Sequence, residues 1–449
     1  MAQQLYFSRD SKMFVEFGGV DTSTTRTVGA LWEVPILDGF SFSQATNSSE
    51  ITLAEMESTG GTSRRGRRLF NDSLAPVEWS FSTYMRPFKS AGGGNANDAD
   101  SAAEVHSVEE AFWALMACAD TYTANSFTRT ANPVAGPVVT PGTGSETITF
   151  AESNRSVMPT CTLYFFINTA ADNPVVYKIT NAAVNEAGID FDVDGIATIN
   201  WSGFGKEITD FSGSVHRDAT LPIYTDTTVD TTTIAKGDIW IDSDNDDAFH
   251  LMSNVTNSSE ASVQAIDEGT SATNNFIRNR LTQLAITADD TTTFPGASSN
   301  GVYTLTLTGG NITITNNLTY LVPEELGLVN KPIENITGAR SVSGSFTCYL
   351  AYEDTGGNNG TSTDFFNDLT TSASLEQVVN KFDLIFKVGG STTDNSVPAV
   401  QFHLDKAHIE IPSHSIEDVI SLETSFHGLG ESIGDTDEVA ITYYGPTPA

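Results

Sequence analysis

Most of the chain alternates apolar and polar residues with a period of two, between short turn signals. This pattern is typical of half-buried antiparallel β-strands. Residues 189–201 alternate on both sides of Asp194-Gly195, which predicts a β-hairpin with acidic residues along one face. Residues 303–314 alternate apolar residues with threonines around Gly309-Gly310, which predicts a second hairpin. We therefore expect a mainly β protein.

Helical patterns are few. Residues 107–119 combine a capping box, Ser107 with Glu110, and apolar residues spaced along one face, which predicts a helix. A weaker capping box, Ser374 with Gln377, predicts a second helix start.

Four blocks of sequence recur in the same order in the two halves of the chain. The paired blocks are 46–49 with 315–318, 79–85 with 344–350, 162–167 with 383–388, and 179–205 with 404–430, the last pair aligned without a gap. One weak match could arise by chance, but four in one order favour a duplicated domain. The duplication also favours assembly into a closed ring with pseudo-symmetry.

The duplication and the composition together predict the domain boundaries. Residues 1–217 form the first domain, with an insertion at about 120–160. A polar segment rich in Thr, Asp and Ser, residues 218–270, is a linker or insertion, and residues 271–449 form the second domain.

Charge excludes some functions. The chain has 57 acidic and 22 basic residues and a formal net charge of −35, which disfavours ordinary nucleic-acid binding. Such acidity suits either salty surroundings or one acidic face that lets a polyanion slide past. Residues 1–10 lack the pattern of a signal peptide, and no apolar run reaches about 20 residues, so we expect synthesis in the cytoplasm and no membrane contact.

Chemistry-bearing motifs are absent or incomplete. There is no P-loop, HExxH, GxSxG or dinucleotide fingerprint, and the three cysteines form no CxxC. Asp242, Asp244 and Asp246 resemble the start of a calcium loop, but the required Gly and Glu are missing. The three histidines within residues 403–414 have strand spacing that separates the first two, so a shared metal is not expected. We expect no enzyme activity, no metal and no cofactor.

One basic cluster stands out in this acidic chain. Its four members lie in a loop flanked by Gly and Ser: Arg64, Arg65, Arg67 and Arg68. The loop is either simply solvated or contacts an acidic patch on a neighbouring subunit, where guanidinium groups pair well with carboxylates.

Several longer runs carry a family resemblance. They are RRGRRLFNDSLAPVEWSFSTYMRPFK at 64–89, WSGFGKE at 201–207, NNFIRNRLTQL at 274–284, GGNITITNNLTYLVPE at 309–324 and ARSVSGSFTCYL at 339–350. The chain resembles the major tail tube protein of T5-like siphophages, and the resemblance touches both halves.

The resemblance implies a fold and an assembly. The fold would be two tandem antiparallel β-sandwich domains, each with a flanking helix, whose inner strands join into a continuous β-barrel on assembly. The chain would form homotrimeric, pseudo-hexameric rings that stack into a tube. Its other partners would be a tape measure protein inside the tube, tail terminator and tail-tip proteins, and DNA in transit without specific binding. The location would be the phage tail of the virion, assembled in the host cytoplasm.

The resemblance also suggests roles for charged residues. The four arginines match the family's long loop and become candidates for inter-subunit or inter-ring contacts. Five acidic residues are candidates for lumen or surface charge: Asp190, Asp192, Glu410, Glu417 and Asp418. The alternatives are another β-rich virion protein, such as a distal tail ring or baseplate hub component, and a carbohydrate-binding module or hydrolase.

Overall fold

The computed structural model describes most of the chain. The described residues are 5–8, 11–17, 20–21, 26–27, 30–51, 68–89, 104–123, 126–130, 135–150, 156–167, 175–211, 215–217, 239–242, 247–251, 263–265, 276–289, 294–298, 300–352, 360–372, 382–390, 397–416, 418–432 and 435–445. They are mainly β, as predicted, and contain two α-helices, α1 (Glu110–Met116) and α2 (Ser362–Ser372). None of their helices is long and apolar enough to cross a membrane.

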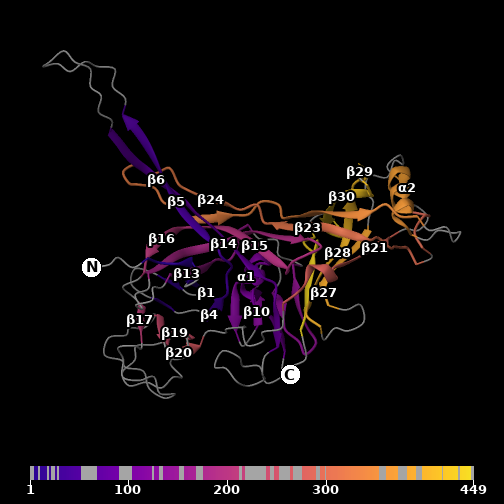
Figure 1. Cartoon of the computed structure of the whole chain (residues 1–449). Helices are drawn as coiled ribbons and strands as arrows, with labels where there is room; N and C mark the ends of the chain where they lie inside the picture. The colour runs from indigo at the N-terminus through magenta and orange to yellow at the C-terminus, as the bar shows by residue number, and fades with distance from the viewer. Residues whose placement is uncertain are drawn as a thin grey trace, which may run out of the picture.

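One antiparallel sheet, here called the long sheet, crosses the upper side of the molecule (Figure 1). In order across the sheet its strands are β5 (Ser41–Ile51), β6 (Arg68–Tyr84), β15 (Thr198–Gly205), β14 (Val175–Phe191), β23 (Leu307–Thr315), β26 (Ser341–Tyr349), β30 (Ile420–Leu429) and β29 (Ser413–Ile416). The far ends of β5 and β6 extend together as an arm beyond the body. Both halves of the chain thus contribute to one sheet.

Two further sheets, here called the back sheets, lie behind the long sheet. The first contains β4 (Ala30–Val34), β1 (Ser11–Phe17), β13 (Cys161–Ile167), the first part of β14 and β16 (Glu207–Asp210). The second contains β22 (Val302–Tyr303), β21 (Gln283–Ala288), β27 (Phe382–Gly389), β28 (Ala399–Ile409) and β31 (Ala440–Tyr444). The order of strand pairing is the same in both back sheets. In each half one strand also pairs with the long sheet: β14 pairs with β15, and β28 pairs with β30.

The segment between α1 and β13, where an insertion is predicted at about 120–160, contains four described strands. Its strands are β9 (Thr121–Thr123), β10 (Ser126–Arg129), β11 (Gly136–Thr140) and β12 (Ser145–Thr149), and β12 pairs with the C-terminal β31. These strands therefore extend the second back sheet through β31. The described part of 215–265 forms a small sheet of β17 (Val215–Arg217), β18 (Ile239–Asp242), β19 (Asp247–Leu251) and β20 (Val263–Ala265).

Short elements complete the described chain. They are β2 (Val20–Asp21), β3 (Arg26–Thr27), β7 (Pro87–Lys89), β8 (Val105–Ser107), β24 (Thr319–Leu321), β25 (Glu334–Ile336) and the 3-10 helix η5 (Asn279–Leu281).

One of the two predicted hairpins is confirmed and the other is wrong. β14 pairs with β15 as predicted, and Gly195 in the turn has a φ of +119°, a conformation that favours glycine. Gly309 and Gly310 instead lie inside the continuous strand β23. A Cβ at Gly310 would stand 2.6 Å from the carbonyl oxygen of Ser345, so glycine permits close approach of β26 rather than a turn.

The alignment of 179–205 with 404–430 without a gap is wrong, because the strands after the two hairpin turns correspond with a shift of two residues. Ala183 pairs with Phe204, so the alignment predicts that His408 pairs with Leu429. His408 pairs with His427 instead, because the turn of the second hairpin is shorter.

The first helix is confirmed, but its predicted cap is wrong. Ser107 ends β8, and the N-cap of α1 is Glu109, which makes no side-chain capping bond. The second predicted helix start lies outside the described residues. The structure instead has α2, whose start carries a capping box: Thr361 Oγ1 accepts from the Asp364 N–H at 3.3 Å, and Asp364 accepts from the Thr361 N–H at 3.1 Å.

The largest hydrophobic core of the described residues contains side chains of both halves and includes α1. Every residue of α1 is buried. The Trp113 ring lies 4.7 Å from Trp201 of the first half and 6.4 Å from Phe402 of the second, and its Nε1 donates to the Tyr443 hydroxyl at 2.9 Å. The two halves therefore fold as one packed body.

Candidate functional site

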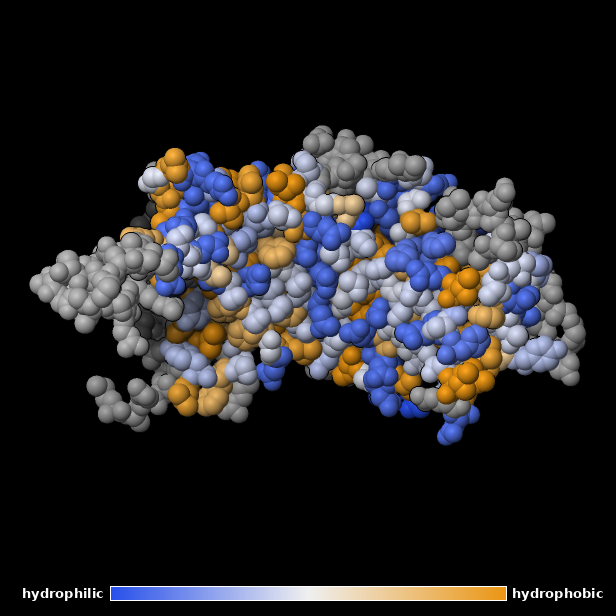
Figure 2. Space-filling view, turned by 90° about the horizontal axis from the view of Figure 1, so that it is seen from above, coloured by the Kyte–Doolittle hydropathy of each residue, from blue (hydrophilic) through white to orange (hydrophobic). Residues whose placement is uncertain are grey.

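The long sheet has one buried face and one open face. In β15, Ile199, Trp201 and Gly203 turn to the core, while Asn200 and Ser202 turn to the opposite side. Strand geometry sends successive side chains to opposite faces, so the same division runs across the sheet. Figure 2 views the molecule from above this sheet, and pale to blue residues predominate across its middle.

Small polar side chains form continuous rows across the open face. Strand register defines two of these rows, Ser41–Ser80–Ser202–Glu186–Thr315–Ser341 and Ser82–Asn200–Gly188–Thr313–Ser343–His427. Neighbours within the rows are hydrogen bonded: the hydroxyls of Ser41 and Ser80 lie 2.8 Å apart, and the hydroxyl of Ser82 donates to Asn200 at 2.7 Å. Polar side chains of neighbouring strands thus bond to one another across this face.

The charge of the open face is negative. Its acidic members are Glu78, Glu186, Asp190 and Glu423, and none of the side chains described on this face is Lys or Arg. A surface of hydroxyls and carboxylates repels a polyanion and has no cation to hold it.

The two halves meet in the long sheet at the pairing of β14 with β23. Gly188 pairs with Thr313, Ile189 with Ile312 and Phe191 with Gly310. Behind the junction, the Phe191 ring stacks on Phe386 of the second back sheet at 5.8 Å. In order across the sheet, the final strand of the first half, β14, therefore pairs with the initial strand of the second half, β23.

Both outer strands of the long sheet leave an edge open. Within the described part of the chain, β5 pairs only with β6, and β29 pairs only with β30. On β29 the Ile416 side chain is 79% exposed. Phe40 precedes β5 and Phe42 lies on it, and both side chains are half-buried. Their ring centroids lie 5.5 and 4.9 Å from that of Phe165 in the first back sheet. Unpaired strand edges with exposed apolar side chains are templates for pairing with another chain.

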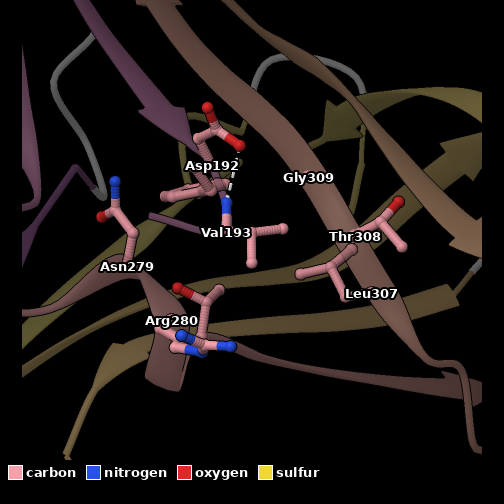
Figure 3. A pocket seen from close by; sticks show the side chains of 9 residues that line it. Asp192, Val193, Asn279, Arg280, Leu307, Thr308 and Gly309 are labelled. Carbon is pink, nitrogen blue, oxygen red and sulfur yellow. Dashed lines mark hydrogen bonds between the residues drawn. The ribbon is translucent and has the colours of Figure 1, made fainter. Parts of the chain in front are cut away.

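A shallow crevice of about 60 Å³ lies where β14 ends, beside η5 and the start of β23 (Figure 3). The Asp192 carboxylate accepts a hydrogen bond from the Val193 N–H at 2.6 Å, and Asn279 and Arg280 line the opposite side. Asp192 therefore lies at the rim of the junction between the halves rather than on the open face.

The other acidic candidates fall in different places. Asp190 lies on the open face of β14. Glu410 is exposed after β28, with Oε1 3.5 Å from Nε2 of His427. Asp418 is exposed in the turn between β29 and β30, and Glu417 lies outside the described residues. Of the acidic candidates that the structure describes, Asp190 alone lies on the open face of the long sheet. Asp192, Glu410 and Asp418 lie beyond the ends of strands.

The basic cluster and the metal-like motifs are only partly described. Arg64, Arg65 and Arg67 lie outside the described residues, as do Asp244 and Asp246, and Arg68 begins β6. The three histidines of residues 403–414 do not share a site. His403 bonds Asp383 at 2.8 Å, and the ring of His414 packs on Phe366.

Three acidic residues of the open face escaped sequence reasoning. Glu78, Glu186 and Glu423 each occupy a polar position beside buried residues of the same strand. The alternation on β6, β14 and β30 contained this signal.

These features define a class of protein: a β-rich subunit whose sheet has a polar open face and two edges available for further strands. No protein-family model matches the chain. The chain is 26% identical over 434 residues to the tail tube protein pb6 of Escherichia phage T5, an alignment that covers 97% of this chain and 75% of the phage protein. The resemblance to T5-like tail tube proteins is confirmed.

Proposed function

We propose that this chain is a structural subunit of a phage tail tube that polymerises with copies of itself into stacked rings. The open polar face of the long sheet would line the lumen. The similarity to a tail tube protein over nearly the whole chain supports this role. The observation that carries the proposal is the β14–β23 pairing, because it shows within one chain how one half can join the next.

The proposal treats the two halves, residues 1–217 and 271–449, as copies of one domain. Their strand pairings run in the same order, with β5 corresponding to β23 and β29 corresponding to the end of β14. By this correspondence the β14–β23 junction inside the chain repeats between chains as β29 paired with β5. In that register Ser413 of one chain faces Ser43 of the next, as Gly188 faces Thr313.

Side chains at the two edges support the same register. Phe191 covers Phe386 inside the chain, and the corresponding residues are Ile416 and Phe165. Ile416 is 79% exposed, and Phe165 sits beneath the half-buried Phe40. Burying an isoleucine side chain contributes about 1.5–3 kcal/mol, and the added backbone hydrogen bonds contribute about 0.5–1.5 kcal/mol each.

Ring closure follows from strand number. With three chains, as the resemblance implies, the eight long-sheet strands of each chain make a barrel of about 24 strands. At a spacing of about 4.8 Å and a tilt of about 40°, such a barrel has a backbone diameter of about 48 Å. After side chains are subtracted, the channel is wide enough for duplex DNA and its solvent.

The lumen chemistry fits passage of DNA without binding. The four carboxylates on the open face of each chain repel phosphates, and the hydroxyl rows remain hydrated. Within this proposal the arm of β5 and β6 and the arginine cluster contact an adjacent subunit or ring. The tape measure protein occupies the lumen during assembly, and tail terminator and tail-tip proteins close the two ends. The chain has no catalytic role.

Electron microscopy tests the assembly. We expect rings with threefold symmetry and six similar domains from the purified protein, and antibody labelling along the tail shaft of virions. Labelling confined to the capsid or to the tail tip would refute the tube role, and the tip pattern would favour a distal ring or hub component.

Cysteine pairs test the register. A Ser43→Cys/Ser413→Cys chain should form disulfides between chains only in assembled rings. Gly188→Cys/Thr313→Cys is the matched control, since the same geometry occurs inside one chain and should give an intramolecular disulfide. Rings in which the control oxidises and the Ser43/Ser413 pair does not would contradict the proposed edge pairing.

A further inference from the structure

A cluster of buried titratable side chains lies at the start of α1, apart from the residues of the open face. His106 is on β8, Glu110 is the first residue of α1, and Glu146 is on β12. All three side chains are buried, with exposures of 5%, 5% and 0%. Three separate elements thus bring one imidazole and two carboxylates together.

The three side chains have the geometry of a ligand set. One ligand atom from each residue lies within 4.8 Å of the others, and His106 Nδ1 is 2.9 Å from Glu110 Oε2. Around a zinc ion the ligand distances are about 2.0–2.2 Å, so ligand atoms lie up to about 4 Å apart. Side-chain movements of less than about 1 Å would close the set on one ion.

Glu146 is the independent observation that points to a ligand. It is fully buried and lies among these groups, and neither of its carboxylate oxygens makes a well-formed hydrogen bond, although the Ser107 hydroxyl and the Glu110 carboxyl interact with it. A buried carboxylate without a partner is costly, and proteins retain one when it is paired or coordinates a metal. The adjacent acid Glu109 differs, because it accepts a hydrogen bond from the Tyr443 hydroxyl.

We propose that His106, Glu110 and Glu146 bind one divalent transition-metal ion, with Zn²⁺ as the best match. Two carboxylates and a neutral imidazole balance the charge of such an ion inside the core. One nitrogen with two oxygen ligands suits Zn²⁺ better than Mg²⁺ or Ca²⁺, which prefer oxygen alone. A water molecule would complete a tetrahedral shell.

The metal would have a structural role. It would tie β8 and α1 to β12, and β12 pairs along its length with the C-terminal strand β31. In that pairing Glu146 lies opposite Tyr443. The ion would therefore fasten the insertion of the first half to the last strand of the second half, independently of any assembly into a tube.

Metal analysis of the purified full chain tests this site. We expect about one Zn²⁺ per chain by mass spectrometry after equilibration with Zn²⁺ and gel filtration. Chelation with EDTA should lower the melting temperature, and Zn²⁺ should restore it. Replacing Zn²⁺ with Co²⁺ should give visible absorption bands in the wild-type chain, a readout that needs no variant.

Substitutions locate the ion. Glu146→Gln keeps the side-chain shape and should lose the metal and the response of the melting temperature to EDTA. Glu423→Gln, on the open face, is the matched control and should keep both. If Glu146→Gln fails to fold, the Co²⁺ spectrum of the wild type still decides between an imidazole-carboxylate site and none.

The rival state is a protonated acid. Burial raises the pKa of the Glu146 carboxyl well above its usual range, and the negative charge of Glu110 raises it further. A wild-type chain that binds no Zn²⁺ or Co²⁺, with a melting temperature indifferent to EDTA, would overturn the proposal and leave Glu146 as a neutral carboxylic acid.

Discussion

Gly203 and Gly188 lie on neighbouring strands of the long sheet and allow a matched test of its two faces. Gly203 turns to the core, where an added Cβ would stand 2.1 Å from the carbonyl oxygen of Ala183 and 2.3 Å from Cζ2 of Trp79. Gly188 turns to the open face, where the nearest atom to an added Cβ is 4.0 Å away. A glycine-to-alanine substitution is therefore crowded at Gly203 and unhindered at Gly188.

We expect Gly203→Ala to destabilise the chain by about 3 kcal/mol, at the upper end for overpacking, because one obstacle is backbone and cannot rotate away. Gly188→Ala should lie within about 1 kcal/mol of the wild type, since the added Cβ meets no atom closer than 4.0 Å and reduces the freedom of the unfolded chain. The measurement is the midpoint of urea unfolding, followed by tryptophan fluorescence.

A double variant separates the two obstacles at Gly203. Trp79→Phe removes the indole contact but leaves the Ala183 carbonyl, so Gly203→Ala/Trp79→Phe should be no more stable than Gly203→Ala. Recovery of the wild-type midpoint in the double variant would refute the backbone argument. Equal losses for Gly203→Ala and Gly188→Ala would refute the assignment of faces.

Three further predictions concern the core, a buried ion pair and the sheet edge. Trp201→Ala should cost about 3–5 kcal/mol in urea unfolding, because the ring is buried and donates to a hydroxyl, whereas Ser202→Ala on the open face should cost at most about 0.5 kcal/mol. Arg340→Ala should cost about 3–5 kcal/mol by leaving a nearly buried carboxylate unpaired, whereas Lys331→Ala, at a pair whose lysine side chain is 50% exposed, should cost less than about 1 kcal/mol; comparable losses would contradict the burial argument. Ile416→Asp should leave the melting temperature of the isolated subunit unchanged but abolish rings in electron micrographs, and normal rings would contradict the edge pairing.

The sequence by itself determined features that depend on neighbours along the chain. Alternation and the Asp194-Gly195 turn predicted the β14–β15 hairpin, because strand phase and a positive φ are local requirements. The apolar pattern located α1 for the same reason. The missed helix α2 had a local signal too, since Thr361 and Asp364 form a capping box. The long motif runs were enough to carry the family resemblance, which the comparison confirmed.

Only the tertiary structure decided which distant segments meet. The Gly309-Gly310 pair predicts a turn, yet it lies within a strand, where β26 approaches closely. Trp113 bonds Tyr443 across 330 residues of sequence, and β12 pairs with the C-terminal strand β31, which no local pattern specifies. The burial of Glu146 follows from that pairing. Contacts of this kind depend on the packing of the whole core, so the open face, its two edges unpaired among the described strands, and the buried cluster of His106, Glu110 and Glu146 emerged only with the fold.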